Sequence, residues 1–204
     1  MTEGLRLFVF ARHAESTANA AHMLSSDPSR LVTLTARGQS EARALGVQLA
    51  NLPVDLAVCT RLLRTQETID IALHGRPVPI VIEPDFDELR VGDLDGGPIE
   101  TLHVWKQQHS PDDRLPHGES MDDAYGRYAN ALRHLLARTE TVTLAVIHEI
   151  GLRHIVTAAA GTSWPDMTFG NAVPFLLDEH AVRRAADRLD AMARSGRSQA
   201  DRIG

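Results

Sequence analysis

The feature that most constrains the fold is an alternation between short apolar runs and segments with helical periodicity. The runs are rich in Val, Ile, Leu and Phe, and they lie at residues 5–11, 54–59, 78–82, 142–147 and 172–177. Runs without strict polar alternation are typical of strands that are covered on both faces. We therefore expect a central sheet between two layers of helices.

Capping residues mark where the helices between these runs begin and end. Thr35 and Thr60 are expected to cap the first two helices, and Ser120 with Asp123 has the spacing of a capping box. Gly161 suits the left-handed end of a later helix. The expected helices run over about 35–52 and 60–73, onward from 120, and over 150–160.

Strands that alternate with helices predict a three-layer α/β/α domain with a largely parallel sheet. Pro174 in the last run predicts an edge strand or a bulge, because proline cannot donate a ladder hydrogen bond. We expect the domain to span residues 1–180, with residues 92–118, rich in Asp, Gly, Pro and His, as an excursion that covers the site. Residues 181–204 are expected to form a tail that is a solvated helix or mobile, with mobility in the last dozen residues.

Composition excludes several classes of function. The chain has 204 residues and a net charge of -6, which argues against binding to nucleic acid or to a membrane surface. No apolar run is long enough to span a membrane, and the N-terminus lacks the basic region and the small-residue cleavage site of a signal peptide. The single Cys59 excludes an intrachain disulfide and fits a reducing cytoplasm. Both a monomer and a homodimer are compatible with the sequence.

Polar side chains follow the apolar runs where ligands usually bind. In open parallel sheets this place is the crevice beyond the carboxyl ends of the strands. Two arginines, two histidines and one carboxylate are expected to converge there. They are Arg12, His13, Arg64, Glu88 and His148.

This set of side chains suits a phosphoryl group. An arginine fork matches phosphate oxygens and keeps its charge, and a histidine nitrogen is a competent nucleophile at neutral pH. A carboxylic acid with a raised pKa can protonate a leaving oxygen. The histidines show no CxxC or HExxH spacing, so we expect no metal and no cofactor.

Seven segments together resemble the histidine phosphatase superfamily, which is also called the phosphoglycerate mutase-like family. Its hallmark is an Arg-His-Gly-Glu-type motif after the first strand, and further motifs follow in the same order along this chain. They are RHAESTAN at 12–19, LTARGQSEA at 34–42, CTRLLRTQET at 59–68, ELRVGDLDG at 88–96, PHGES at 116–120, LAVIHEIGLRHI at 144–155 and NAVPFLL at 171–177.

The resemblance implies a role for each matched side chain. His13 would be the nucleophile that becomes phosphorylated, and Glu88 would be the proton donor. Arg12, Asn19, Arg64 and His148 would bind the phosphoryl group, although Ser16 and Asn19 also suit a simple helix cap. The expected activity is that of a metal-independent phosphatase of small phosphomonoesters.

Glu149 is the departure from the family pattern with the largest chemical consequence, because a glycine commonly follows the second histidine. A carboxylate here either repels phosphate, pairs with an arginine such as Arg153, or contacts a cationic part of the substrate. Ala14 replaces the usual glycine after the nucleophile, and Cys59-Thr60 replaces a Ser-Ser pair.

Two alternative functions stay open. A phosphoglycerate mutase would need a longer basic insertion than residues 96–116, which offer only Lys106 and Arg114. A phosphate-binding protein with a degraded site would be consistent with Glu149, whereas the intact set of catalytic side chains argues against it.

Overall fold

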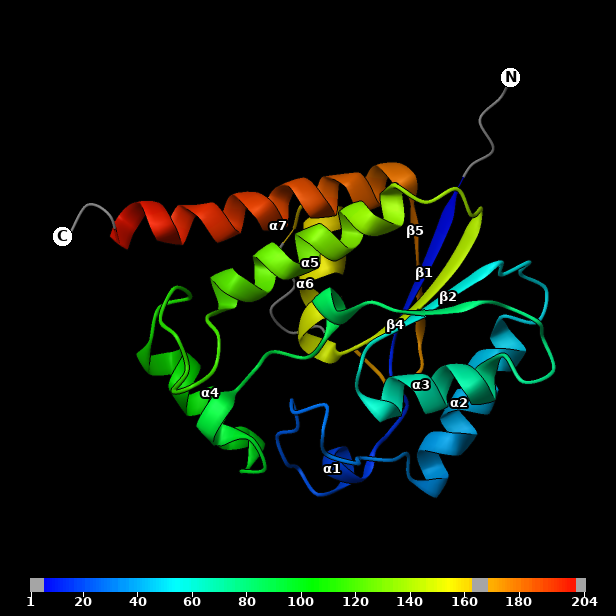
Figure 1. Ribbon diagram of the computed structural model, residues 1–204, viewed down its shortest axis with the longest axis horizontal. Helices are drawn as coiled ribbons and strands as arrows, with labels where there is room; N and C mark the ends of the chain where they lie inside the picture. The colour runs from blue at the N-terminus through cyan, green and yellow to red at the C-terminus, as the bar shows by residue number, and fades with distance from the viewer. Residues whose placement is uncertain (1–5, 163–168, 201–204) are drawn as a thin grey trace.

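A five-stranded sheet forms the centre of the protein, in the strand order β3-β2-β4-β1-β5. The computed structural model describes residues 6–162 and 169–200 (Figure 1). The strands β1, β2, β3 and β4 are mutually parallel, and β5 runs antiparallel to β1. Their bounds are β1 Leu7–Arg12, β2 Leu56–Cys59, β3 Ile80–Ile82, β4 Val142–Ile147 and β5 Pro174–Asp178.

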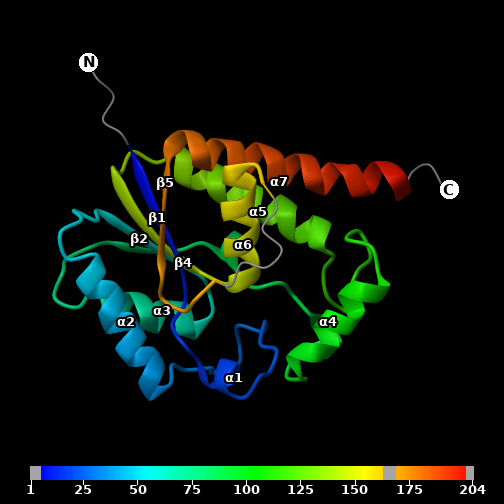
Figure 2. The same cartoon turned by 180° about the vertical axis from the view of Figure 1, so that it is seen from behind.

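Helices cover both faces of the sheet, which confirms the predicted three-layer α/β/α fold with a largely parallel sheet (Figures 1 and 2). The α-helices are α1 Thr17–Ala20, α2 Ala36–Gln48, α3 Leu63–Ala72, α4 Ile99–Gln108, α5 Met121–Leu136, α6 Glu149–Ala160 and α7 Glu179–Ala200. Two short 3-10 helices are η1 Pro84–Phe86 and η2 Gly92–Leu94.

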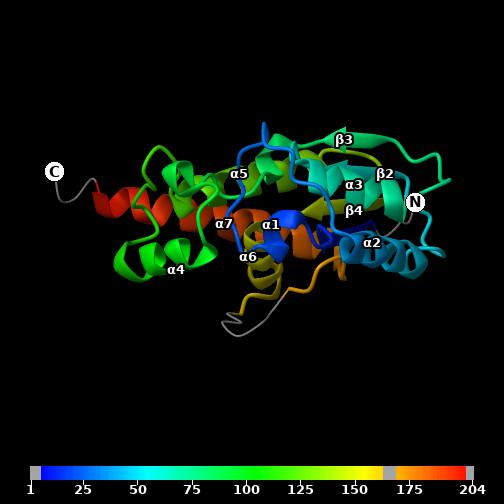
Figure 3. The same cartoon turned by 90° about the horizontal axis from the view of Figure 1, so that it is seen from below.

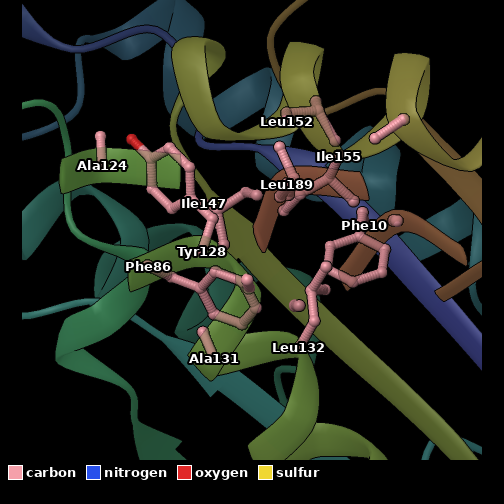
Figure 4. Close-up of a cluster of buried hydrophobic side chains, with 14 of the residues drawn as sticks. Phe10, Phe86, Ala124, Tyr128, Ala131, Leu132, Ile147, Leu152, Ile155 and Leu189 are labelled. Carbon is pink, nitrogen blue, oxygen red and sulfur yellow. The ribbon is translucent and has the colours of Figure 1, made fainter. Parts of the chain in front are cut away.

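Successive side chains of β1 enter two separate cores, because neighbouring residues of a strand point to opposite faces. Phe8 and Phe10 pack with α5, α6 and α7, whereas Val9 and Ala11 pack with α2 and α3. Figure 4 shows the first core, in which Phe10 lies near Leu132. Because β1 is buried on both faces, its carboxyl end is held rigidly.

Most predicted helix ends are confirmed. The Thr35 hydroxyl accepts a hydrogen bond from the Gly38 N–H at 3.0 Å and caps α2, which ends at Gln48 rather than near residue 52. Ser120 and Asp123 form the predicted capping box of α5. Gly161 ends α6 with a φ of 76°, which is the left-handed conformation.

The predicted Thr60 cap is wrong. Helix α3 begins at Leu63, and its N-cap residue, Leu62, makes no side-chain cap hydrogen bond. The Thr60 hydroxyl instead lies 2.9 Å from the His148 Nε2 atom. A capping hydroxyl and one that orients a side chain of the site look alike in the sequence, because both follow a strand.

The two edge strands are less covered than the runs suggested. Ile80 and Ile82 of β3 are 47% and 51% exposed, so this strand is not buried on both faces. Pro174 begins the antiparallel strand β5 at the other edge, as its missing N–H predicts.

The C-terminal tail is a helix with one buried face rather than a solvated one. In α7, Val182, Ala185 and Leu189 are fully buried against α5 and α6, and Leu189 joins the core in Figure 4. Figures 1 and 2 show α7 lying along α5. Alanine and arginine dominate the segment and hide this apolar stripe in the sequence. The last dozen residues were predicted to be mobile, and residues 201–204 of this segment lie outside the described residues.

The excursion at residues 92–118 contains η2 and α4, the latter a helix that the sequence analysis did not predict. Figure 3 views the molecule from the carboxyl ends of the parallel strands, and α1, α4 and α6 surround this end. Within residues 6–162 and 169–200, no helix is long and apolar enough to cross a membrane.

Candidate active site

The carboxyl ends of the strands border a cavity of about 80 Å³. Its lining includes most of the predicted site residues, namely Arg12, His13, Asn19, Arg64 and Glu88. The sixth, His148, is fully buried and contacts Arg64. The prediction that these side chains gather at one edge of the sheet is therefore confirmed, while their chemical roles stay predictions.

The hydrogen bonds of His13 determine its tautomer. The Nδ1 atom lies 2.8 Å from the Ala14 carbonyl oxygen, which only accepts, so Nδ1 carries the proton. The Nε2 atom keeps its lone pair and accepts a hydrogen bond of 3.0 Å from the Arg64 Nε–H. Burial, and next the charges of Arg64 and Arg12, hold the His13 pKa well below its usual value. His13 is therefore neutral at pH 7, with Nε2 as a nucleophilic nitrogen.

The backbone around His13 is fixed from two sides. Asn171, which precedes β5, donates from its side-chain amide to the His13 carbonyl oxygen at 2.8 Å. The Ala14 N–H donates to the Thr68 hydroxyl of α3 at 3.1 Å. His13 is thus held by elements on both sides of β1.

Arg64 connects both histidines. Its side chain donates to His13, to the Ser25 carbonyl oxygen at 2.9 Å and to the His148 Nδ1 atom at 3.2 Å. Burial lowers the Arg64 pKa to about 10, so the guanidinium keeps its charge at pH 7. Arg64 is only 4% exposed, and such a buried cation is favourable when an anion is bound beside it.

His148 has the opposite tautomer. Its Nδ1 atom accepts from Arg64, so Nε2 carries the proton and donates to the Thr60 hydroxyl at 2.9 Å. Burial, and next the charge of Arg64, hold the His148 pKa well below its usual value. The ring lies edge-on to His13, with 5.3 Å between the centroids.

Glu88 follows η1 in the chain and lines the cavity. Its side chain is 18% exposed. Its Oε2 atom is 4.0 Å from the His148 Nδ1 atom, and its Oε1 atom accepts from the Leu89 N–H at 2.9 Å. Burial raises the Glu88 pKa, and the charge of Arg64 opposes that shift. A raised pKa favours the protonated carboxyl group that a proton donor needs.

Arg12 forms an ion pair with Glu149, the carboxylate that departs from the family pattern. The Arg12 Nη1 atom lies 2.9 Å from the Glu149 Oε2 atom and donates to the Phe169 carbonyl oxygen at 3.1 Å. The other Glu149 oxygen accepts from Arg153 at 2.9 Å. Glu149 lines the cavity and pairs with two arginines, so the pairing with Arg153 considered from the sequence is present together with one to Arg12.

Asn19 combines the two readings that the sequence allowed. Ser16 and Asn19 form a capping box for α1, with the Asn19 Oδ1 atom accepting from the Ser16 N–H at 3.1 Å. Asn19 also lines the cavity. Its oxygen is engaged by Ser16, and its amide nitrogen is the group that a phosphoryl oxygen would contact.

Sequence reasoning missed the residues that hold Glu88 in place. Arg127 of α5 donates to the Asp85 and Asp87 carbonyl oxygens at 2.8 and 3.2 Å. It also pairs with Glu119, whose carboxylate accepts from the Arg90 N–H at 2.9 Å. These contacts fix the segment on either side of Glu88. Glu119 stands in the PHGES motif, which was the one signal available in the sequence.

Glu83, Asp85 and His134 could share a metal ion, since their ligand atoms lie within 4.8 Å of one another. None of the three lines the catalytic cavity.

Known proteins share this sequence pattern and this fold. Residues 8–173 match the sequence profile of the histidine phosphatase superfamily (branch 1). The chain belongs to that superfamily. The family predicted from the sequence motifs is therefore confirmed, and with it the phosphatase class.

Several relatives carry a named activity. The chain is 28% identical over 158 residues to the probable phosphoglycerate mutase GpmB of Serratia proteamaculans, a match that covers 74% of this chain and 73% of the relative. It is 32% identical over 108 residues to the adenosylcobalamin/alpha-ribazole phosphatase of Salmonella typhimurium, which covers 53% of this chain and 46% of that protein.

A solved structure shares the fold. It belongs to a putative alpha-ribazole-5'-P phosphatase from Escherichia coli and superposes with a TM-score of 0.75 at 22% identity, covering 85% of this chain and 90% of the other.

Proposed function

We propose that the protein hydrolyses small phosphomonoesters without a metal ion, through a phosphohistidine on His13. The observation that carries this proposal is the pair of contacts on the His13 ring. The proton sits on Nδ1, and the Nε2 lone pair faces Arg64 at the cavity. A neutral imidazole whose Nε2 lone pair carries no proton, beside two guanidinium groups, is suited to attack an anionic phosphoryl group.

In the first step, the His13 Nε2 atom forms a bond to phosphorus while the bond from phosphorus to the ester oxygen breaks. Arg12, Arg64 and the Asn19 amide stabilise the phosphoryl oxygens, and arginine supplies the positive charge that metal ions supply in other phosphoryl-transfer sites. Protonated Glu88 gives its proton to the leaving oxygen, which is released as an alcohol.

In the second step, water attacks the phosphohistidine. The Glu88 carboxylate takes a proton from the water as its oxygen bonds to phosphorus, and the bond to Nε2 breaks. Phosphate leaves, and Glu88 and His13 return to their starting protonation states. The His13 Nδ1–H donates to Ala14 throughout, which keeps the ring oriented.

His148 has a supporting role in this proposal. Its Nδ1 atom accepts from Arg64 and therefore orients the guanidinium toward the cavity. A bound dianion favours protonation of nearby groups, so phosphate binding would raise the His148 pKa and make Nδ1 a donor. The buried bond to Thr60 holds the ring in place for that change.

A His13→Ala variant tests the proposal. We expect it to fold and to lose turnover of every phosphomonoester by several orders of magnitude, because the nucleophile is absent. Wild-type turnover should survive chelators, and rapid acid-free quenching should trap phosphate on His13. Turnover by a folded His13→Ala protein would contradict the proposal.

Phosphoglycerate mutase activity is the second candidate, because relatives such as the Serratia protein carry that name. The carboxylate of a phosphoglycerate would approach Glu149, whose negative charge opposes it. Isomerisation of 3-phosphoglycerate, assayed beside its hydrolysis, separates the two activities. A phosphate-binding protein without turnover is the third, and intact histidine and arginine contacts disfavour it.

The cytoplasm is the proposed location, because the single Cys59 is buried and unpaired.

A further inference from the structure

A second cavity adjoins the catalytic one. It has a volume of about 240 Å³ and shares Leu89 and Leu102 with the lining of the catalytic cavity. Leu89 directly follows Glu88, the proposed proton donor. In an in-line displacement the leaving oxygen departs on the side opposite the nucleophile. The second cavity therefore lies beside the group that would meet the leaving alcohol.

Aromatic rings form much of this second cavity. Trp105 of α4 stacks on His109, the residue that follows this helix. The ring centroids are 3.5 Å apart, and the angle between the ring planes is 4°. The lining also contains Tyr125 of α5, which packs edge-on against His154 of α6 with 4.8 Å between the ring centroids. Burial lowers the His154 pKa to about 4, so that ring is neutral at pH 7. Such walls favour a flat apolar group.

The charged groups in the lining are already engaged. Glu119 pairs with Arg127, and the Asp113 carboxylate accepts from the Ser110 N–H at 2.8 Å. Burial lowers the Lys106 pKa, and the charge of the Glu88 carboxylate opposes that shift. The carboxylates of the second cavity are therefore engaged by protein groups, and burial disfavours the charged form of its lysine.

Glu149 adds a restriction at the catalytic cavity. Its carboxylate is held in the lining by Arg12 and Arg153, at 2.9 Å from each. Both oxygens of this carboxylate are bound by arginines, so Glu149 occupies Arg153 and part of the Arg12 guanidinium, which could otherwise pair with a second anionic group close to the phosphate ester. Such a group would lack a cationic partner in a partly buried site, which is unfavourable.

We propose that the substrate is a phosphomonoester whose alcohol carries a flat, uncharged ring. This ring binds in the cavity lined by Trp105 and Tyr125. Glu149 selects against an anionic alcohol. The inference rests on the proposed phosphatase activity. It names the chemical class of the leaving group, which the family alone leaves open.

Three synthetic substrates test the proposal. Their leaving alcohols have similar pKa values, so differences in kcat/KM report binding of the rest of the alcohol. They are 2-phenylethyl phosphate, n-butyl phosphate and 4-phosphonooxybutanoate, which present a ring, a plain chain and an anionic chain. We expect kcat/KM to be at least about tenfold higher for the phenylethyl ester than for the butyl ester, the usual size of an added apolar contact. The anionic ester should be poorer than the butyl ester.

Variants assign these preferences to residues. Trp105→Ala should reduce the phenylethyl-to-butyl ratio of kcat/KM severalfold, mainly through KM, and Trp105→Phe should keep most of the ratio. Val104→Ala is the matched control, because Val104 lies on the same helix, is 49% exposed and lines neither cavity. Glu149→Gln should raise kcat/KM for the anionic ester relative to the butyl ester.

The outcomes distinguish this inference from the proposed function. Equal kcat/KM for the phenylethyl and butyl esters, or a ratio that Trp105→Ala leaves unchanged, overturns the ring site while hydrolysis still stands. An anionic-to-butyl ratio that Glu149→Gln does not change overturns the role of Glu149. If the wild-type protein hydrolyses none of the esters, the proposed function itself fails.

Discussion

Two histidines of the site carry their protons on different ring nitrogens, and each choice follows from one neighbour. The Ala14 carbonyl places the proton of His13 on Nδ1, and the Arg64 guanidinium places that of His148 on Nε2. Both rings are buried beside cations, which keeps them neutral. At the scale of single residues, the proposed mechanism thus uses one nitrogen as the nucleophile and another in a supporting role.

Glu88→Gln should lower kcat/KM, which reports the first step, most for substrates with poor leaving groups, because the amide cannot donate a proton to the departing oxygen. We expect a loss of about 10²- to 10⁴-fold for alkyl phosphates. The loss for p-nitrophenyl phosphate should be much smaller, since its leaving group needs no proton. Steady-state kinetics on both substrates provide the measurement. An equal loss on both would show that Glu88 is not the proton donor.

Helices and their connections position these residues. Arg127 of α5 holds the segment that carries Glu88 through hydrogen bonds to its backbone. Helix α7 packs in the core that contains Phe8 and Phe10 of β1. Neither element contributes a side chain to the catalytic cavity among the described residues. At this scale, packing distant from the cavity fixes the geometry of the chemistry.

Arg127→Gln should lower kcat for alkyl phosphates at least tenfold, because the segment around Glu88 loses its hydrogen bonds and Glu119 loses its partner. The affinity for inorganic phosphate, measured as competitive inhibition, should change little, since Arg12 and Arg64 remain. Arg133→Gln is the control, because Arg133 lies on the same helix and pairs with Asp190 of α7 rather than with the segment around Glu88. Loss of phosphate affinity parallel to kcat would indicate general disruption instead.

Leu189→Ala should lower the free energy of unfolding by about 2–5 kcal/mol, since it removes a fully buried side chain of α7 and leaves a cavity. Met192→Ala on the same helix should cost much less, because Met192 is 39% exposed. Urea denaturation of both variants gives the comparison. Similar small losses would mean that α7 adds little to the core.

The whole molecule responds to pH through its buried groups. Burial lowers the pKa of His13, of His148 and, to about 4, of His154, so below pH 6.5 the unfolded chain binds more protons than the folded protein. Stability therefore increases as the pH rises toward 6.5. Glu88 acts in the opposite direction above pH 4.5, because its folded pKa is raised.

The free energy of unfolding should accordingly increase between pH 5 and 6.5. Each histidine that stays neutral in the folded state adds a slope of about 1.4 kcal/mol per pH unit well below pH 6.5. His148→Gln should reduce the slope by about this amount. Urea unfolding across this pH range measures it. An unaltered slope in His148→Gln would refute the prediction.

Much of the fold could be predicted from the sequence, because strand periodicity and capping residues are local signals. The positions of His13 and His148 followed from where strands end. The burial of α7 did not, since its apolar stripe is built largely of alanine. Two hydrogen bonds could not be predicted, because each joins residues far apart in the chain. One joins Thr60 to His148, and the other joins Arg127 to the backbone beside Glu88.

The hydrogen bond from Arg64 to the His13 lone pair has a consequence for the reactivity of this ring. In the proposed mechanism, the attacking nitrogen is covered by a donor until an anionic phosphoryl group draws the guanidinium away. Binding of the substrate and exposure of the nucleophile are then a single event. We therefore expect acylating and alkylating reagents that lack a negative charge to react slowly with His13, which still reacts with phosphate esters.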